Sequence, residues 1–186
     1  DTTPLDVEAC RGLLPRGGTV LGSSRLQPFG LEDGVERARS TIERHGLGGL
    51  VVVGGEGPLS CAHRLHAEGF PVVGVPKTID NDLPLPEGIP TFGFETAREH
   101  GTTVVERILE DMRTTNRWFF IVMMGRSAGH LSLGAGKAAG APIMLIPEEF
   151  PDRPIAFEDV VRTLEGAIVK RLSQGRPDGV AVIAEG

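Results

Sequence analysis

The chain has 186 residues, which is long enough for one well-packed domain and short for two. Its formal net charge of -6, without a basic run, argues against a nucleic-acid surface, and no apolar run reaches the roughly 18 residues of a membrane helix. The two cysteines, Cys10 and Cys61, lack metal-ligand spacing and are expected to be reduced thiols. We therefore expect a cytoplasmic protein that binds neither nucleic acid nor a membrane.

The first 30 residues combine a short helical pattern with a loop of small residues. The pattern in residues 1–18 ends at Pro15, and residues 17–30 predict a short strand followed by a loop that carries Arg25. Small residues let backbone N–H groups approach an anion, and an arginine fork can then bind phosphate oxygens. The alternative is an arginine in a solvated loop.

A helix, a strand, a glycine-rich turn and a second helix follow. Residues 31–47 predict an amphipathic helix, and the apolar run 48–55 predicts a parallel strand buried on both faces. The turn GGEG then places Glu56 at the carboxyl end of that strand, where open parallel sheets bind ligands. The helix expected over residues 58–68 points its N-terminal dipole at the same place.

The stretch PKTIDND, residues 76–82, carries the most specific polar pattern of the chain. If it is extended, Thr78, Asp80 and Asp82 project to one side. One carboxylate there could accept a proton from a hydroxyl, and the other could help to hold a divalent metal on a phosphate. The alternative is a turn in which the Asp and Asn side chains bond their own backbone.

The rest of the chain continues the alternation of strands and helices. Helices are expected over residues 91–117, 128–140 and 157–175, and strands over residues 118–125, 141–149 and 178–186. Alternation over the whole length predicts an α/β fold with a doubly wound, mostly parallel sheet and helices on both faces.

Five motifs occur together in one order: GGTVLGSSR, GGEG, PKTIDND, TFGFETA and MGR. In this order the chain resembles the phosphofructokinase family from about Arg16 to its C-terminus, and the PKTIDND and MGR pair is highly specific. The resemblance implies phosphoryl transfer to the 1-hydroxyl of fructose 6-phosphate, which gives fructose 1,6-bisphosphate in glycolysis. It also implies ATP or pyrophosphate as the donor and Mg²⁺ as the cofactor.

The resemblance implies roles for the carboxylates and for Thr78. Asp80 would be the base that accepts the proton of the 1-hydroxyl. Asp82, with Glu56 of the GGEG turn, would serve the magnesium on the donor phosphates. Thr78 would contact the sugar phosphate and the transferring group.

The resemblance also implies roles for five residues that contact the sugar or supply positive charge. Lys77 and Arg126 would supply the positive charge that the reaction needs. Met124 and Gly125 would line the sugar site, with core packing as a further interpretation of Met124. Glu185 matches a glutamate that binds sugar hydroxyls.

On the donor side, the resemblance assigns Arg25 to the donor phosphates and places the donor at the turn Gly55, Glu56 and Gly57. Arg117 matches an arginine that reaches into the sugar site of a neighbouring subunit, which implies a homo-oligomer, a dimer or a tetramer. The alternative for Arg117 is a cation favoured by the helix macrodipole.

Members of the family are longer than this chain, and they open with a glycine-rich donor loop that is not found here. Residues 1–186 are therefore expected to form the phosphoryl-donor-binding domain, incomplete at both ends and reaching the first strand of the sugar-phosphate-binding part. We expect this fragment to be inactive by itself.

Two departures from the family pattern bear on activity, and one position bears on the donor. Glu56 replaces the usual aspartate, and Pro58 replaces the usual Ser or Thr, so a regulatory paralogue that binds sugar phosphate without turnover is an alternative. Relatives that use pyrophosphate carry an aspartate at the position of Gly57, where glycine leaves room for ATP. Lys77 is shared with pyrophosphate users and with one group of ATP users. The sequence favours ATP, with pyrophosphate as the alternative donor.

Overall fold

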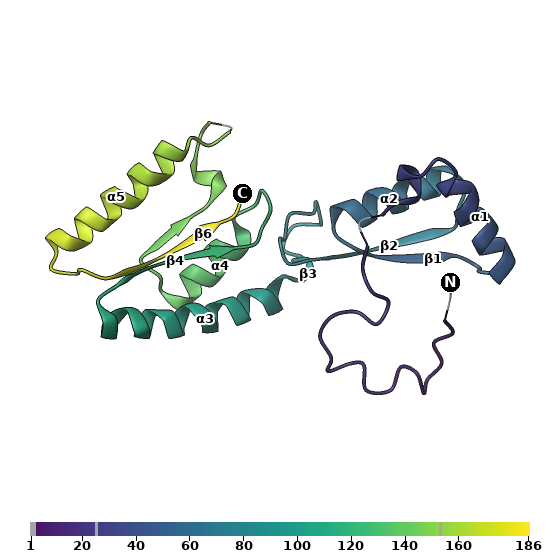
Figure 1. Ribbon diagram of the computed structural model, residues 1–186, viewed down its shortest axis with the longest axis horizontal. Helices are drawn as coiled ribbons and strands as arrows, with labels where there is room; N and C mark the ends of the chain where they lie inside the picture. The colour runs from purple at the N-terminus through teal and green to yellow at the C-terminus, as the bar shows by residue number, and fades with distance from the viewer. Residues whose placement is uncertain (1–2, 25, 153) are drawn as a thin grey trace.

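The computed structural model describes residues 3–24, 26–152 and 154–186. Its strands form two three-stranded sheets, ordered β1-β2-β3 and β4-β6-β5, and every pairing is parallel (Figure 1). The α/β class with parallel strands is confirmed, although the strands divide between two sheets instead of forming one. We call the first sheet with its helices the first lobe and the second sheet with its helices the second lobe.

The elements lie close to their predicted positions. The first lobe contains a 3-10 turn at Pro28–Gly30, α1 (Gly34–His45), β1 (Leu50–Gly54), α2 (Glu56–Ala67), β2 (Val72–Thr78) and β3 (Phe92–Gly93). The second lobe contains α3 (Phe94–Thr115), β4 (Trp118–Met123), α4 (His130–Ala139), β5 (Ile143–Leu145), a 3-10 turn at Pro147–Glu149, α5 (Phe157–Ser173) and β6 (Gly179–Ala184).

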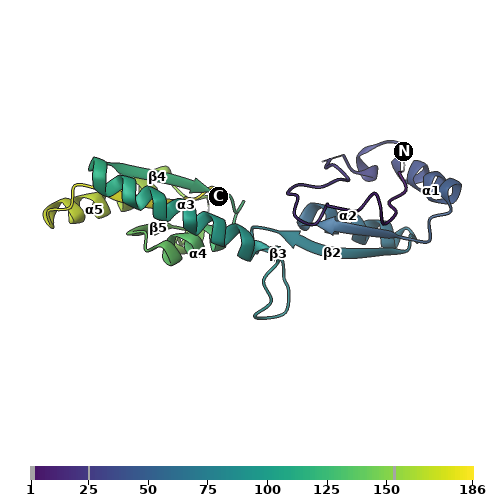
Figure 2. The same ribbon diagram turned by 90° about the horizontal axis from the view of Figure 1, so that it is seen from below.

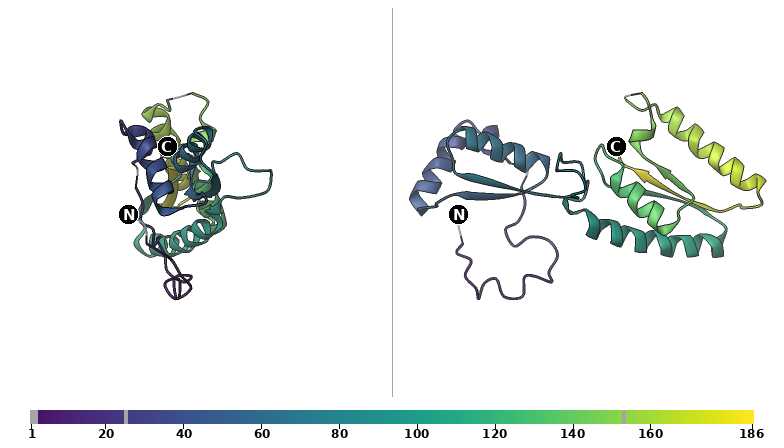
Figure 3. Two further views of the ribbon diagram at one scale, coloured as in Figure 1. Left: turned by 90° about the vertical axis from the view of Figure 1, so that its right-hand side faces the viewer. Right: turned by 180° about the vertical axis from the view of Figure 1, so that it is seen from behind.

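The first sheet is covered on one face only. Helix α2 packs against β1 and β2 through buried residues such as Leu65, and α1 lies on the same side (Figure 3). On the other face, the side chains of Val51 and Val73 are 70% and 61% exposed, and Val53 and Val75 are exposed beside them. The prediction that β1 is buried on both faces is therefore wrong for the described residues. We call these four residues the valine face.

The second sheet carries the main hydrophobic core. Helices α3 and α4 cover one face and α5 lies over the other (Figure 1). The core joins α3 to β6 and consists of Val105, Leu109, Met112, Ala141, Val180 and Val182. Helix α4 approaches the sheet closely because it carries Gly136, where a Cβ atom would lie 2.6 Å from Met144 Cγ.

The N-terminal segment differs from the prediction. Among described residues 3–24 and 26–27, the backbone forms turns but no helix and no strand. Most apolar side chains there are exposed, including Val7, Leu14 and Leu21. A single helical turn without tertiary contacts does not repay its nucleation cost, which explains why the short helical pattern fails.

The two lobes meet where β2 ends and α3 begins. Figure 2 shows the loop between β2 and β3 projecting from this junction. The short strand β3 pairs with Lys77 and Thr78 of β2 and leads directly into α3. No helix of the described residues is long and apolar enough to cross a membrane.

Candidate active site

The polar residues of the GGEG, PKTIDND and MGR motifs meet at the carboxyl ends of the strands. Nη1 of Arg126 lies 2.6 Å from Oε2 of Glu56, and Nη2 of Arg126 lies 3.9 Å from Oδ2 of Asp80. Glu56 and Asp80 belong to the first lobe, and Arg126 follows β4 in the second lobe. The arginine therefore bridges the two lobes through two carboxylates that are far apart in the sequence.

Arg126 is held by its backbone as well as by its side chain. Its φ is 53° and that of Gly125 is 157°, so the MGR turn adopts a conformation that suits glycine at the second position. Oε1 of Glu185 accepts hydrogen bonds from the N–H groups of Gly125, at 3.2 Å, and Arg126, at 2.8 Å. Glu185 thus fixes the turn that presents Arg126.

Asp80 is the most buried carboxylate of the site, with 8% of its surface exposed. Its backbone N–H donates to Oγ1 of Thr78 at 3.1 Å. Burial raises the pKa of the Asp80 carboxyl, and the charges of Asp82 and Glu185 raise it further, whereas Arg126 and a hydrogen bond from Thr78 lower it. A carboxylate with a raised pKa beside an arginine can accept a proton from a bound hydroxyl group.

The GGEG turn lies beside the end of β2. A Cβ atom on Gly55 would lie 3.5 Å from Cβ of Thr78, and one on Gly54 would lie 2.6 Å from Cγ of Pro58. Glycine is therefore required at position 54 of the tight β1–α2 connection, whereas a Cβ atom at position 55 would make an ordinary contact. Helix α2 begins at Glu56, two residues before the predicted start, so Glu56 occupies the first turn, where a helix favours negative charge.

A hollow of about 850 Å³ opens beside this turn, and its lining includes Glu56, Gly57 and Arg126. Nε2 of Gln27 donates to the carbonyl oxygen of Gly57 at 3.4 Å. A Cβ atom on Gly57 would meet only that nitrogen, at 3.9 Å, so the position has room for a side chain. The hollow is large enough for a phosphate-bearing ligand.

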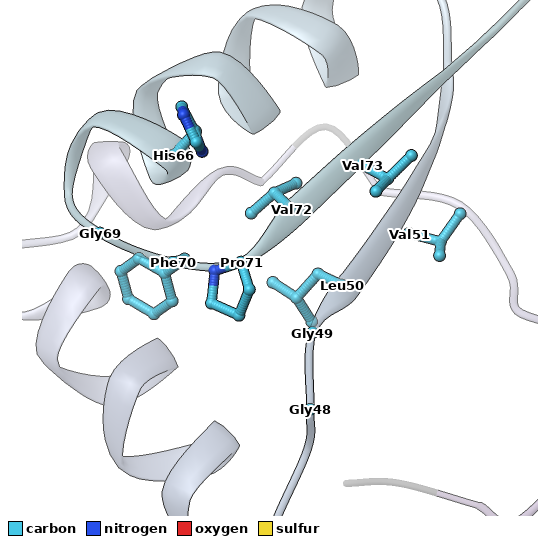
Figure 4. A pocket seen from close by; sticks show the side chains of 10 residues that line it. All are labelled: Gly48, Gly49, Leu50, Val51, His66, Gly69, Phe70, Pro71, Val72 and Val73. Carbon is cyan, nitrogen blue, oxygen red and sulfur yellow. The ribbon is translucent and has the colours of Figure 1, made fainter.

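A second hollow, of about 720 Å³, lies at the opposite ends of β1 and β2 (Figure 4). Its lining consists of His66 of α2 and of apolar and glycine residues at the start of β1, at the start of β2 and in the α2–β2 connection, which includes Phe70 and Pro71. It contains none of the predicted site residues. The polar groups at the carboxyl ends are therefore the candidate active site.

The described residues contain no group of three His, Cys, Asp or Glu side chains that could hold a metal ion. Magnesium does not require such a group when phosphates supply the remaining ligands, because one or two carboxylates are then sufficient. Asp82 stands close enough to Asp80 to raise its pKa, and Glu56 stands across Arg126 from it. These carboxylates are compatible with a magnesium ion that is bound together with a phosphate ligand.

Other predicted site residues lie apart from this cluster or differ from expectation. Arg117 immediately precedes β4, at the end of that six-residue strand opposite to the MGR turn. Met124 is 61% exposed, so the interpretation of its side chain as core packing is wrong. Lys77 lies in β2 with its side chain exposed, next to Thr78. Arg25 lies outside the described residues.

Sequence reasoning missed the contacts between Thr91 and the PKTIDND segment, which involve Thr78 and Asn81. The side-chain oxygen of Asn81 accepts the backbone N–H of Thr91 at 2.9 Å, and the Thr91 hydroxyl donates to the Thr78 carbonyl at 2.8 Å. Asn81 and Thr91 stand inside quoted motifs, but neither motif indicates that they contact each other. The left-handed backbone of Asn81, with φ of 55°, brings them together.

The two parallel sheets and the cluster of carboxylates and arginine at their carboxyl ends define an α/β protein with a candidate polar site where ligands bind in open parallel sheets. A family model described as Phosphofructokinase matches residues 1–186. The chain belongs to the phosphofructokinase family.

Individual relatives agree with this assignment. Pyrophosphate--fructose 6-phosphate 1-phosphotransferase of Thermotoga maritima is 49% identical over 185 residues, which cover 98% of this chain and 44% of that protein. ATP-dependent 6-phosphofructokinase 3 of Streptomyces coelicolor is 41% identical over 186 residues, which cover 100% of this chain and 52% of that protein. The chain thus spans about half the length of these relatives.

The fold of the chain is also similar to solved structures. The crystal structure of Pichia pastoris phosphofructokinase superposes with a TM-score of 0.77 at 28% identity and covers 98% of this chain and 20% of that one. The crystal structure of pyrophosphate-dependent phosphofructokinase from Marinobacter aquaeolei gives a TM-score of 0.67 at 25% identity. The match covers 91% of this chain and 43% of that one.

Proposed function

We propose that the full-length protein transfers a phosphoryl group to the 1-hydroxyl of fructose 6-phosphate. The observation that carries this proposal is the position of Asp80, a buried carboxyl with a raised pKa that faces Arg126 across the junction between the lobes. The family membership and the names of the relatives support the choice of sugar phosphate as the acceptor.

In the proposed reaction, the 1-hydroxyl oxygen bonds to the transferring phosphorus while the bond from phosphorus to the leaving phosphate oxygen breaks. Asp80 takes the proton of the hydroxyl, and Arg126 neutralises charge on the transferring group. Lys77 and Thr78 bind the phosphoryl groups, while Met124, Gly125 and Glu185 line the sugar site.

Magnesium is the proposed cofactor, held by Glu56 and Asp82 together with the donor phosphates. When bound, it neutralises the charge that develops on the phosphate oxygens. Glu56 is paired with Arg126 in the structure, so it would have to give up this ion pair in order to hold the metal. Arg126 would then be available to the transferring group.

Residues 1–186 are proposed to supply the donor-binding part and the beginning of the sugar-phosphate part of a longer chain. Arg117 is proposed to complete the sugar site of a neighbouring subunit in a homo-oligomer. Its place at the opposite end of β4 supports this, because it stands away from the Asp80 and Arg126 cluster of its own chain.

We propose ATP as the donor. Gly57 lines the hollow beside the GGEG turn and has no side chain to crowd the inner phosphate of a nucleotide. Pyrophosphate is the second candidate, favoured by Lys77 and by the relative from Thermotoga maritima, which is named for pyrophosphate. Steady-state assays of the full-length protein with each donor, coupled to detection of fructose 1,6-bisphosphate, test this choice.

The substitution Gly57→Asp gives the sharpest test of the donor. The position has room for the side chain, so the main effect should be electrostatic. Like charges at about 4 Å cost roughly 4 kcal/mol at an effective dielectric constant of 20, which would lower ATP turnover several hundredfold. The matched control is Gly57→Asn, which has nearly the same size without the charge and should lose much less.

Three other outcomes would contradict parts of the proposal. An unsubstituted enzyme that uses pyrophosphate and ignores ATP would show that Gly57 does not decide the donor. Equal losses in the Asp and Asn variants would show that crowding, not charge, acts at this position. Binding of fructose 6-phosphate by calorimetry without turnover on either donor would favour the regulatory paralogue.

A further inference from the structure

Thr91 uses all of its hydrogen-bonding groups although it is almost completely buried, with 2% of its surface exposed. Its N–H donates to Oδ1 of Asn81 at 2.9 Å, and its hydroxyl donates to the carbonyl oxygen of Thr78 at 2.8 Å. Its own carbonyl accepts the N–H of Phe94 at 3.1 Å. A single side chain and its backbone thus join the end of β2 to the beginning of α3.

The two residues that Thr91 contacts in the first lobe stand on either side of Asp80. Strand β2 ends at Thr78, and Asn81 follows with a positive φ of 55°, a conformation that asparagine tolerates better than most residues. The segment 78–81 is therefore fixed at both ends by one buried threonine. Without these two bonds, Asp80 would lie in a short turn followed by the projecting loop that leads to β3.

We propose that Thr91 is a positioning residue that holds Asp80 in place for proton transfer. This inference rests on the proposed function, because it takes Asp80 as the proton acceptor. Thr91 does not contact the reacting groups itself; it acts through Thr78 and Asn81. Misplacement of a catalytic group by about 1 Å can cost on the order of 10²-fold in rate, so the loss of one of these hydrogen bonds beside Asp80 should have a measurable effect.

The kinetic experiment uses the full-length protein and compares Thr91→Val with Thr91→Ser. Valine has nearly the same shape but lacks the hydroxyl, and serine restores the hydroxyl. We expect kcat to fall roughly 10- to 100-fold in the valine variant with little change in KM for fructose 6-phosphate. The serine variant should recover most of the loss. Failure of serine to recover turnover, or an unchanged kcat in the valine variant, overturns the inference.

A further variant separates a role at this position from the general effect of removing a threonine hydroxyl. The matched control is Thr103→Val in α3, which also removes a threonine hydroxyl bonded to a backbone carbonyl, at 3.2 Å, but at an exposed position.

Amide hydrogen exchange gives a second measurement that does not depend on turnover. Asn81→Gly removes the oxygen that accepts the Thr91 N–H and keeps the positive φ accessible. Exchange in the segment 78–91 should accelerate in this variant and in Thr91→Val, while exchange in β1, which lies in the same lobe, should stay unchanged. Unchanged exchange in segment 78–91 overturns the inference, even if the unsubstituted protein proves to lack turnover and the proposed function fails.

Discussion

Asp80 experiences opposing influences that set its protonation. Burial and the charge of Asp82 favour the neutral form, and Arg126 favours the ionised form. The balance is a raised pKa, which is a property of general bases, because a carboxylate of ordinary pKa binds a proton weakly. The side chain carries out this role only when it is ionised, so the proposed activity is present above its pKa and is lost as the pH falls through it.

Asp80→Asn should separate the contribution of this residue to turnover from its contribution to stability. The amide keeps the size of the side chain but cannot accept the proton, so kcat should fall on the order of 10²–10⁴-fold with little change in sugar binding. An unaltered kcat would exclude Asp80 as the base.

The same substitution should raise the free energy of unfolding at neutral pH. A carboxyl whose pKa is raised by folding stabilises the fold fully only below its unfolded pKa, and this stabilisation is lost as the pH rises through the folded pKa. The asparagine variant should therefore be more stable than the unsubstituted protein at pH 7. Denaturant titrations at pH 7 and at about pH 4, near the ordinary aspartate value, should show the difference shrinking.

Arg126→Gln should move the pH dependence of the reaction. Arg126 lowers the pKa of Asp80, so its removal should raise that pKa and shift the acidic limb of kcat/KM to higher pH. The overall rate should fall as well, because the transferring group loses its cation. The control is Arg162→Gln in α5, which also breaks an ion pair with an aspartate, here Asp159, and should leave the profile unmoved.

At the scale of elements, most helices and strands could be predicted because their periodicity is local. The helix from Phe94 to Thr115 and the strand from Trp118 to Met123 lie inside their predicted ranges. The exposed face of β1 could not be predicted, because an uninterrupted run of valines is compatible with a strand that is buried on one face and with a strand that is buried on both. Likewise, the contact between Thr91 and Asn81 involves the left-handed backbone of Asn81, which no motif specifies.

The contact between α4 and the second sheet depends on the absence of one side chain. A Cβ atom on Gly136 would lie 2.6 Å from Met144 Cγ and 3.3 Å from Val182 Cβ. Gly136→Ala should therefore overpack this interface and destabilise the protein by about 1–3 kcal/mol, measured by thermal or denaturant unfolding.

Gly166→Ala in α5 is the matched control, because an added Cβ there meets nothing within 4 Å. It replaces a glycine in an exposed part of a helix and should stabilise the protein by roughly 0.5–1 kcal/mol. Stabilisation by both substitutions would show that α4 does not pack as closely as described.

At the scale of the whole molecule, the strands of the two lobes have similar apolar sequences. Only the pairing between strands that are far apart in the sequence assigns each strand to its sheet. Strand β6 pairs with both β4 and β5, whereas β1 pairs with β2. The motifs predicted that Glu56, Asp80 and Arg126 belong to one site, but not that this site joins two sheets. The sequence of a segment indicates that it forms a strand, but it does not indicate which other strand pairs with it.

The valine face predicts how residues 1–186 should behave as an isolated chain. Four neighbouring exposed valines on two paired strands form an apolar patch of the kind that promotes association. We expect sedimentation velocity to show self-association that decreases in the double variant Val51→Thr and Val73→Thr. The control is Val104→Thr on α3, a valine that is 49% exposed away from this face. Equal effects of the double variant and the control would contradict the prediction.

The division into two sheets also decides what spectroscopy can detect. Trp118 is the single tryptophan of a chain without tyrosine, and it lies in β4 beside Phe120. Its fluorescence therefore reports only the second lobe, whereas far-ultraviolet circular dichroism reports the helices and strands of both. A difference between the midpoint temperatures of the two melting curves would measure how independently the lobes unfold. A ligand that contacts both lobes beside Arg126 should make them unfold together, so the two melting curves should coincide.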